Sequence, residues 1–275
     1  MSAVLYEVDQ NVATLRLNQP KSLNAVNPTM IDALLDASSR AADDPKIRAV
    51  LVCTTGKHFM AGGDLKWFQD QLALPAQTCR ENYDALLEKV QKLALCFQAM
   101  EKPVVAAAQG AVAGFGLSLM IAADLVVAAE DAYFTLAYSN IALSPDGGAT
   151  WTLPRFAGLK KAMEIALLGE RFDAPTARTM GLVNRLYPAD QVDVEAKKLA
   201  VRLAAGPAQA IARTKALINA SFDASFKEQL LAEQNSFVGC ATHPDFAEGL
   251  AAFFQKRRPA YGSRDQETDV RNQIS

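Results

Sequence analysis

Short apolar runs alternate with longer amphipathic stretches along the chain, and this alternation predicts an α/β fold. Val4 to Val8 and Val12 to Leu17 have the composition of two strands, and the polar residues between them predict a hairpin. Asparagine followed by proline at positions 27 and 28 predicts the start of an amphipathic helix that continues to about Ala41. The apolar run from Ile47 to Cys53 predicts a buried strand.

The middle of the chain is its most apolar part. Residues 69–80 lack a clean periodicity, so we expect a mobile connection there, followed by a helix over about 81–100. The elements predicted next are a strand at Pro103 to Gln109, a turn and buried helix at Gly114 to Ala122, a strand at Asp124 to Ala129, and helices at Thr150 to Phe156 and Lys160 to Leu168.

Beyond Asp173 the pattern is almost wholly helical, apart from an apolar stretch at Val183 to Tyr187. This part offers no second parallel-sheet core. We therefore expect a core domain over residues 1–190 and a helical region over 191–275 that serves as a trimerisation element or a lid. The last dozen residues are polar and are expected to fray.

Composition narrows the class of protein. With 275 residues, half of them hydrophobic, the chain can form a sizeable core. A net charge of −2 argues against a general nucleic-acid binder, and no segment has the pattern of a membrane span or an export signal, so we expect a cytoplasmic protein. Four widely spaced cysteines and two histidines indicate reduced thiols and no metal site.

The segment from Ser144 to Thr150 is the most informative for chemistry. It places Asp146 in a turn, followed by two glycines that allow a ligand to approach the backbone closely, just before a predicted helix. The alternative is that Asp146 only caps a helix or forms a turn, which are common roles of aspartate. The glycines from Gly114 onward lack the third glycine of a dinucleotide fingerprint, which argues against a nicotinamide enzyme.

Four segments follow one another at compatible spacings, namely Asn18 to Ala25, Phe59 to Lys66, Lys102 to Gly116 and Glu248 to Arg257. Together they resemble the crotonase superfamily of enoyl-CoA hydratases and isomerases. The resemblance covers nearly the whole chain and implies a core of repeated ββα units with a helical C-terminal region. It also implies an acyl-CoA substrate, no further cofactor, and a homotrimer or a hexamer.

The resemblance assigns roles to particular residues. The backbone amides of Gly63 and Phe115 would hold the negative charge that develops on the thioester oxygen. Phe237 and Lys256 would help to complete the CoA site of a neighbouring subunit. The residues that would contact CoA within the chain are Lys21, Leu23, Ala25, Ala61, Gly62, Asp64, Leu65 and Lys66.

The chain departs from the hydratases where those enzymes carry two glutamates, because Ser118 and Tyr138 occupy these places and would only shape the acyl pocket. Asp146 falls where isomerases have a catalytic aspartate. This implies a Δ3,Δ2-enoyl-CoA isomerase or a related ring-opening isomerase of fatty-acid or aromatic-acid metabolism. The alternatives are a hydratase with an atypical base and a non-catalytic acyl-CoA-binding subunit.

Overall fold

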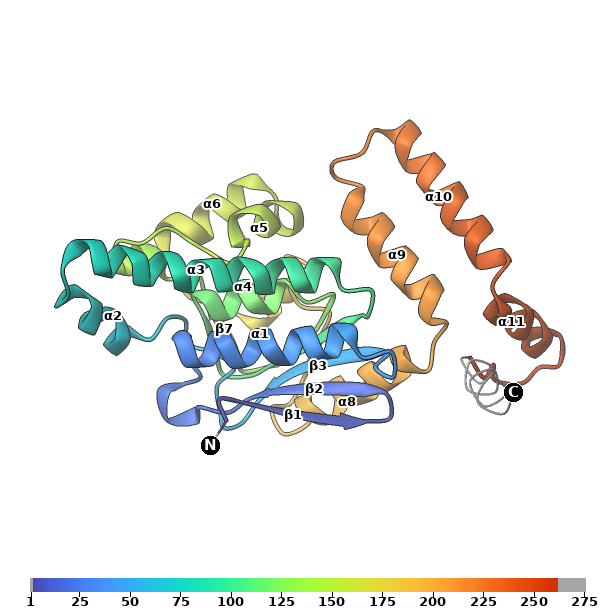
Figure 1. Ribbon diagram of the computed structural model, residues 1–275, viewed down its shortest axis with the longest axis horizontal. Coiled ribbons are helices and arrows are strands. Elements are labelled where there is room, and N and C mark those ends of the chain that lie inside the picture. The colour runs from blue at the N-terminus through green and yellow to red at the C-terminus, as the bar shows by residue number, and fades with distance from the viewer. Residues whose placement is uncertain (1, 262–275) are drawn as a thin grey trace, which may run out of the picture.

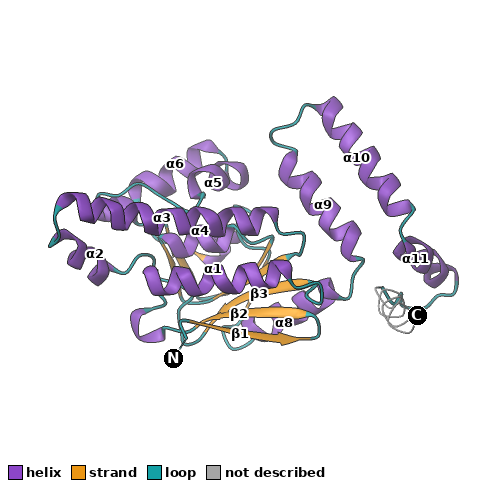
Figure 2. Cartoon of the chain, viewed as in Figure 1, coloured by secondary structure: helices purple, strands orange, loops and turns teal. Residues whose placement is uncertain are grey.

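A computed structural model describes residues 2–261 of the chain. Its strands pair into two sheets. Figure 1 shows the N-terminal strands beside helices from the first half of the chain, whereas the last helices extend away from them. Figure 2 shows the strands gathered in one region with helices around them. The architecture is the α/β arrangement that the sequence predicts, and the predicted fraying of the last dozen residues lies outside the described residues.

The strands are β1 (Val4–Asp9), β2 (Val12–Leu17), β3 (Ala49–Thr54), β4 (Val104–Ala108), β5 (Ala111–Ala113), β6 (Leu125–Ala129), β7 (Tyr133–Thr135), β8 (Phe172–Asp173) and β9 (Arg185–Tyr187). The helices are η1 (Pro20–Ser22), α1 (Pro28–Asp43), α2 (Leu65–Leu72), α3 (Ala76–Ala99), α4 (Phe115–Ile121), η2 (Tyr138–Ile141), α5 (Ala149–Ala157), α6 (Leu159–Leu168), α7 (Ala174–Thr179), α8 (Val192–Ala204), α9 (Ala208–Ala220), α10 (Phe226–Ala241) and α11 (Pro244–Phe254).

The larger sheet has the strand order β1-β2-β3-β4-β6-β9. Its first pair is antiparallel, as the predicted hairpin requires, and the other pairs are parallel. Every residue of β3 is buried, as expected for a central strand that is covered on both faces. The smaller sheet, β5-β7-β8, was not predicted, because strands of two or three residues are too short to show a period.

Helices on either side of the larger sheet complete the core. α1 begins at its predicted cap, where the Asn27 side chain accepts a hydrogen bond from the Met30 amide, and packs against β1 and β2. α8 packs against β2, β3, β4 and β6, and its buried face includes Val192 and Ala196. Part of the region after residue 190 thus belongs to the same core, while the division into two domains stays a prediction.

The expected mobile connection over residues 69–80 is wrong. α2 continues to Leu72, and α3 already begins at Ala76. The Trp67 and Phe68 rings of α2 pack edge-on against the ring of Tyr83 in α3, with centroid distances of 5.4 and 5.7 Å. These tertiary contacts stabilise the two helices, and the local sequence pattern does not encode them.

The three helices after α8 differ from the rest of the chain. α9 and α10 have no buried residue, and α11 has one, Ala252. Figure 1 shows α10 and α11, in orange and red, on the far side of α9 from the strands. None of the helices within residues 2–261 is long and apolar enough to span a membrane.

Candidate active site

Two glycine turns from distant parts of the chain lie directly against each other. A Cβ atom on Gly114 would lie 3.3 Å from the Cα of Gly62, and both glycines have positive φ angles, of 51° and 90°. The turns are held in register by backbone hydrogen bonds from the Ala113 amide to the Met60 carbonyl (2.9 Å) and from the Met60 amide to the Ala111 carbonyl (3.2 Å). Glycine is required here because a side chain at either position would push the turns apart.

Each turn presents amides that have no acceptor within the described residues, and those of Gly63 and Phe115 are among them. Within residues 2–261, neither the Gly63 amide nor the Phe115 amide donates a hydrogen bond, whereas the neighbouring Asp64 and Gly114 amides have acceptors at 2.9 and 3.0 Å. Phe115 is the first residue of α4, where a helix leaves its amides without internal partners. Donors without acceptors at these turns are compatible with an oxyanion site, and the roles that the resemblance assigns to Gly63 and Phe115 stay predictions.

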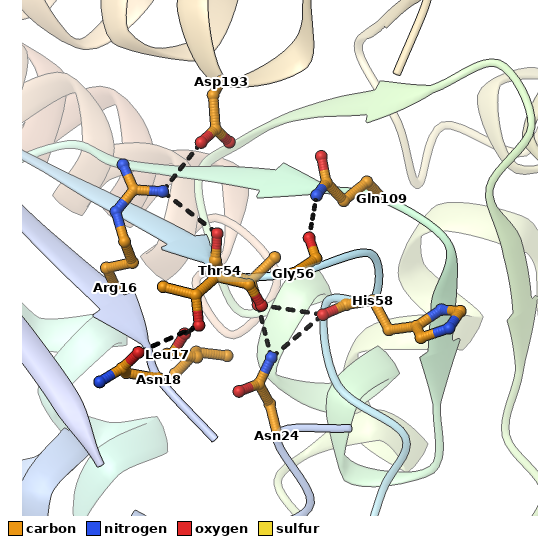
Figure 3. Close-up of polar contacts among 10 residues, drawn as sticks. Arg16, Leu17, Asn18, Asn24, Thr54, Gly56, His58, Gln109 and Asp193 are labelled. Atoms are coloured by element: carbon orange, nitrogen blue, oxygen red, sulfur yellow. Dashed lines mark hydrogen bonds and ion pairs between the residues drawn. The ribbon is translucent and has the colours of Figure 1, made fainter. Parts of the chain in front are cut away.

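Buried Asn24 fastens the N-terminal segment to the residues just before the first glycine turn, and Figure 3 shows its contacts with Thr54 and His58. Its side-chain amide donates to the Thr54 hydroxyl and to the carbonyls of His58 and Phe59 (3.1 Å each), and its side-chain oxygen accepts from the Gln19 amide (2.7 Å). The sequence did not reveal this role, because a single asparagine in a segment without periodicity carries no signal of its burial.

We expect Asn24→Ala to lower the free energy of unfolding by about 1–3 kcal/mol, because it leaves buried polar groups without partners. Asn11→Ala is the matched control. Both asparagines have a left-handed backbone, with φ angles of 54° and 60°, but Asn11 is exposed and makes one side-chain hydrogen bond to a backbone carbonyl. Urea denaturation measures both losses, and equal losses would show that the buried network adds nothing.

The structure brings the two predicted CoA-contacting segments together. The Ala61 amide donates to the Leu23 carbonyl (3.0 Å), and the Val26 amide donates to the Gly62 carbonyl (2.7 Å). Asp64 already has a structural task, since its carboxylate caps α2 and accepts a hydrogen bond from the Asn27 side chain. The side chains of Lys21, Leu23, Leu65 and Lys66 are exposed beside this junction, whereas Ala25 is buried.

Phe237 and Lys256 do not join this site within one chain. Phe237 lies on α10 with 72% of its surface exposed, and Lys256 follows α11. Figure 1 places α10 and α11 at the opposite end of the molecule from α2. Their contribution to the CoA site of a neighbouring subunit stays a prediction.

Asp146 lies beside the second glycine turn and is not the cap of the following helix. α5 begins at Ala149 with Gly148 as its cap, and no side chain caps it. The Asp146 carboxylate instead accepts a hydrogen bond at Oδ1 from the hydroxyl of Tyr138. A purely local capping role therefore does not account for this carboxylate.

Residues of α4 hold the backbone around Asp146. The Ser118 hydroxyl donates to the Asp146 carbonyl (2.9 Å), and a Cβ atom on Gly147 would lie 2.9 Å from both the Phe115 ring and the Ser118 Cβ. The predicted pocket residues Ser118 and Tyr138 therefore contact the predicted catalytic residue. Sequence spacing alone did not show this contact, which spans 28 positions for Ser118.

Burial governs the protonation of the pair. It raises the pKa of Asp146 above its usual range, and the hydrogen bond from Tyr138 opposes this rise only in part. Burial and the neighbouring charge of Asp146 both raise the pKa of Tyr138 far above that of a free phenol. Tyr138 is therefore a hydrogen-bond donor at neutral pH, and Asp146 is the group that can exchange a proton.

A largely apolar cavity reaches the two glycines that follow Asp146. Its lining does not include Asp146, Ser118, Tyr138, Gly63 or Phe115, and it also contains the ion pair of Lys215 and Asp124. Its volume is about 910 Å³, and its walls include Gly147, Gly148 and apolar side chains from α3, α4, α5 and α9 such as Leu95, Ile121, Trp151 and Ile218. A cavity of this size and character can accept an extended apolar group.

Comparisons with known proteins identify the family of the chain. The enoyl-CoA hydratase/isomerase family model matches residues 7–264. The chain belongs to the enoyl-CoA hydratase/isomerase family. It is thus an enzyme of a family that acts on CoA thioesters, and its mixed α/β architecture is the crotonase fold that the resemblance implies.

Relatives within the enoyl-CoA hydratase/isomerase family have different names. A probable enoyl-CoA hydratase of Rhodobacter capsulatus is 34% identical over 261 residues, which cover 95% of this chain and 98% of that protein. The 1,2-epoxyphenylacetyl-CoA isomerase of Escherichia coli is 33% identical over 265 residues, with coverages of 95% and 98%. A crystal structure of an enoyl-CoA hydratase from Polaromonas sp. JS666 superposes with a TM-score of 0.88 at 34% identity, covering 94% of this chain and 99% of that one.

Proposed function

We propose that this chain is an enoyl-CoA isomerase that moves a carbon–carbon double bond in an acyl-CoA thioester, with Asp146 as the proton shuttle. The observation that carries the proposal is the pairing of one half-buried carboxylate, Asp146, with two uncharged side chains, Ser118 and Tyr138. Isomerisation needs a single base that removes and returns one proton. Hydration also needs a group that positions and activates water.

The reaction conserves the atoms of the substrate. Asp146 removes a proton from C2 of a 3-enoyl thioester, and the electron pair of the broken C–H bond delocalises onto the thioester oxygen. The Gly63 and Phe115 amides stabilise this oxyanion, because donors already in place need no reorganisation. Asp146 then returns the proton to C4, and the double bond lies between C2 and C3.

The nature of the substrate is also part of the proposal. The apolar cavity next to Gly147 supports an acyl group that is largely hydrocarbon, either aliphatic or aromatic. A ring-opening isomerisation of an epoxide would use the same base and the same oxyanion site. One relative in the comparisons is named for an epoxide isomerisation.

A screen of 3-enoyl, 2-enoyl and epoxy-arylacetyl thioesters tests the proposal. We expect a product with the mass of its substrate and a change in ultraviolet absorbance from the conjugated thioester. A product heavier by one water would instead support a hydratase with an atypical base. Binding of the thioesters without turnover would support a non-catalytic acyl-CoA-binding subunit.

The assembly of the protein completes the proposal. The helices after α8 carry phenylalanines that are more than 70% exposed, namely Phe226, Phe237, Phe253 and Phe254. Apolar surface of this kind favours contact with further copies of the chain. A homotrimer or a hexamer in the cytoplasm stays a prediction.

A further inference from the structure

The Tyr138 hydroxyl makes the Asp146 carboxylate unsymmetrical. It donates to Oδ1, and no second side chain within residues 2–261 hydrogen-bonds to this carboxylate. Both partners are restrained. Tyr138 is 9% exposed, and the backbone of Asp146 is held by the Ser118 hydroxyl. The two carboxylate oxygens therefore have different surroundings, although their chemistry is the same.

We propose that Tyr138 is a positioning residue, which holds Asp146 through Oδ1 and thereby leaves Oδ2 as the oxygen that takes and returns the substrate proton. This inference rests on the proposed isomerase function. It adds that one particular oxygen of the base carries the proton, and it identifies the residue that selects this oxygen.

The selection follows from hydrogen-bond chemistry. Because its pKa is raised, the Tyr138 phenol keeps its proton at neutral pH. Tyr138 therefore remains a hydrogen-bond donor throughout the reaction. Oδ1 is already an acceptor in that bond, so the proton from C2 goes to Oδ2. In the neutral acid, the Tyr138 bond still holds Oδ1, which keeps the new O–H group in place until the proton returns to C4.

The same bond favours the ionised form of Asp146. Burial raises the pKa of Asp146, and the bond from Tyr138 lowers it, so the bond keeps the base available at a lower pH than burial alone would allow. In the part of the chain that the structure describes, no charged side chain contributes to the pKa shift of Asp146. α4 contributes Phe115 and Ser118, and the turn before α5 contributes glycine backbone. Among the residues described, Tyr138 is the titratable side chain whose contact affects the Asp146 pKa.

Tyr138→Phe tests the inference, because it removes only the hydroxyl. We expect the pKa of the Asp146 carboxyl group to rise further, since a contribution that lowers it is lost. The acidic limb of the pH profile for C2 hydrogen exchange should move to higher pH with it. At a pH below the Asp146 pKa, the variant should exchange about 10- to 100-fold more slowly than the unaltered protein, which corresponds to the loss of a hydrogen bond to a charged group.

A direct measurement of the Asp146 pKa complements the pH profile of C2 hydrogen exchange. Carbon-13 NMR of labelled aspartate carboxyl groups reports the Asp146 pKa directly, with Asp146→Asn used to assign its signal. Tyr133→Phe is the matched control, because it also removes one tyrosine hydroxyl. The Tyr133 ring contacts the Arg171 guanidinium, 4.5 Å from the ring centroid, so this substitution should leave the Asp146 pKa unchanged. Thermal unfolding shows whether each variant is folded.

The results separate the two proposals. A higher Asp146 pKa together with a shifted exchange profile supports the positioning role, and an unchanged Asp146 pKa in folded Tyr138→Phe overturns it. If the pKa rises but the unaltered protein exchanges no C2 hydrogen with any thioester, the proposed function fails while the link between Tyr138 and Asp146 stands. A lower rate with an unshifted profile would mean that Tyr138 only shapes the pocket.

Discussion

Asp146→Asn is expected to lower the rate of C2 hydrogen exchange, and of isomerisation, by about 10²- to 10⁴-fold, which is the usual contribution of general acid–base catalysis. Asparagine has nearly the same shape as aspartate, but its side chain cannot accept a proton at neutral pH. Binding of the CoA thioester should survive, because Gly63, Phe115 and the junction beside Leu23 are not altered. Exchange is measured by incorporation of deuterium from the solvent.

Asp173→Asn is the control for this substitution. Asp173 caps α7 at the surface, and asparagine is an equally good helix cap, so activity and stability should stay unchanged. Retained exchange in Asp146→Asn, together with its loss in Tyr138→Phe, would contradict the assignment. Asp146 would then be a turn residue, and another group would be the base.

The pH dependence gives a further check on Asp146. Only the ionised carboxylate accepts the proton, so activity should fall as the pH decreases through the pKa of Asp146. Because burial raises this pKa, the fall should occur at a higher pH than for a free aspartate.

Gly63→Pro is expected to reduce turnover by about 10²- to 10³-fold, because it removes one of two donors to the oxyanion, a loss that costs about 2.7–4 kcal/mol of transition-state stabilisation. Proline has no backbone N–H and therefore cannot replace the amide of Gly63. Steady-state kinetics with the thioester identified in the screen measure this loss.

The structure supplies a matched control for the oxyanion donor. A Cβ atom at residue 63 would lie 2.5 Å from the ring of Phe68, so alanine and proline both collide with this side chain. Gly63→Ala retains the amide, and Gly63→Pro does not. If both variants fold and lose the same activity, the cause is the collision with Phe68, and the assignment of the Gly63 amide is wrong.

Candidate site residues could be predicted from the sequence only where they belong to a motif of consecutive residues. The segments around Gly63 and Phe115 carry their glycines next to these amides, so the resemblance assigned both residues as oxyanion donors, which stays a prediction. The same holds for Asp146 and the two glycines after it. Asn24 lies within a segment that carries the resemblance, yet nothing in that segment distinguishes Asn24 from its neighbours.

By itself, the sequence determined most strands of the larger sheet and most of the helices, and it indicated Gly63, Phe115 and Asp146 as candidate site residues. It did so because the periodicity of hydrophobic positions indicates which side chains are buried, and because turns require particular residues at particular positions. The packing of α2 on α3, the smaller sheet and the meeting of Gly62 with Gly114 were decided by the tertiary structure alone. The hydrogen bond between Tyr138 and Asp146 belongs with these, because a contact between two segments depends on how both pack and not on the sequence of either one.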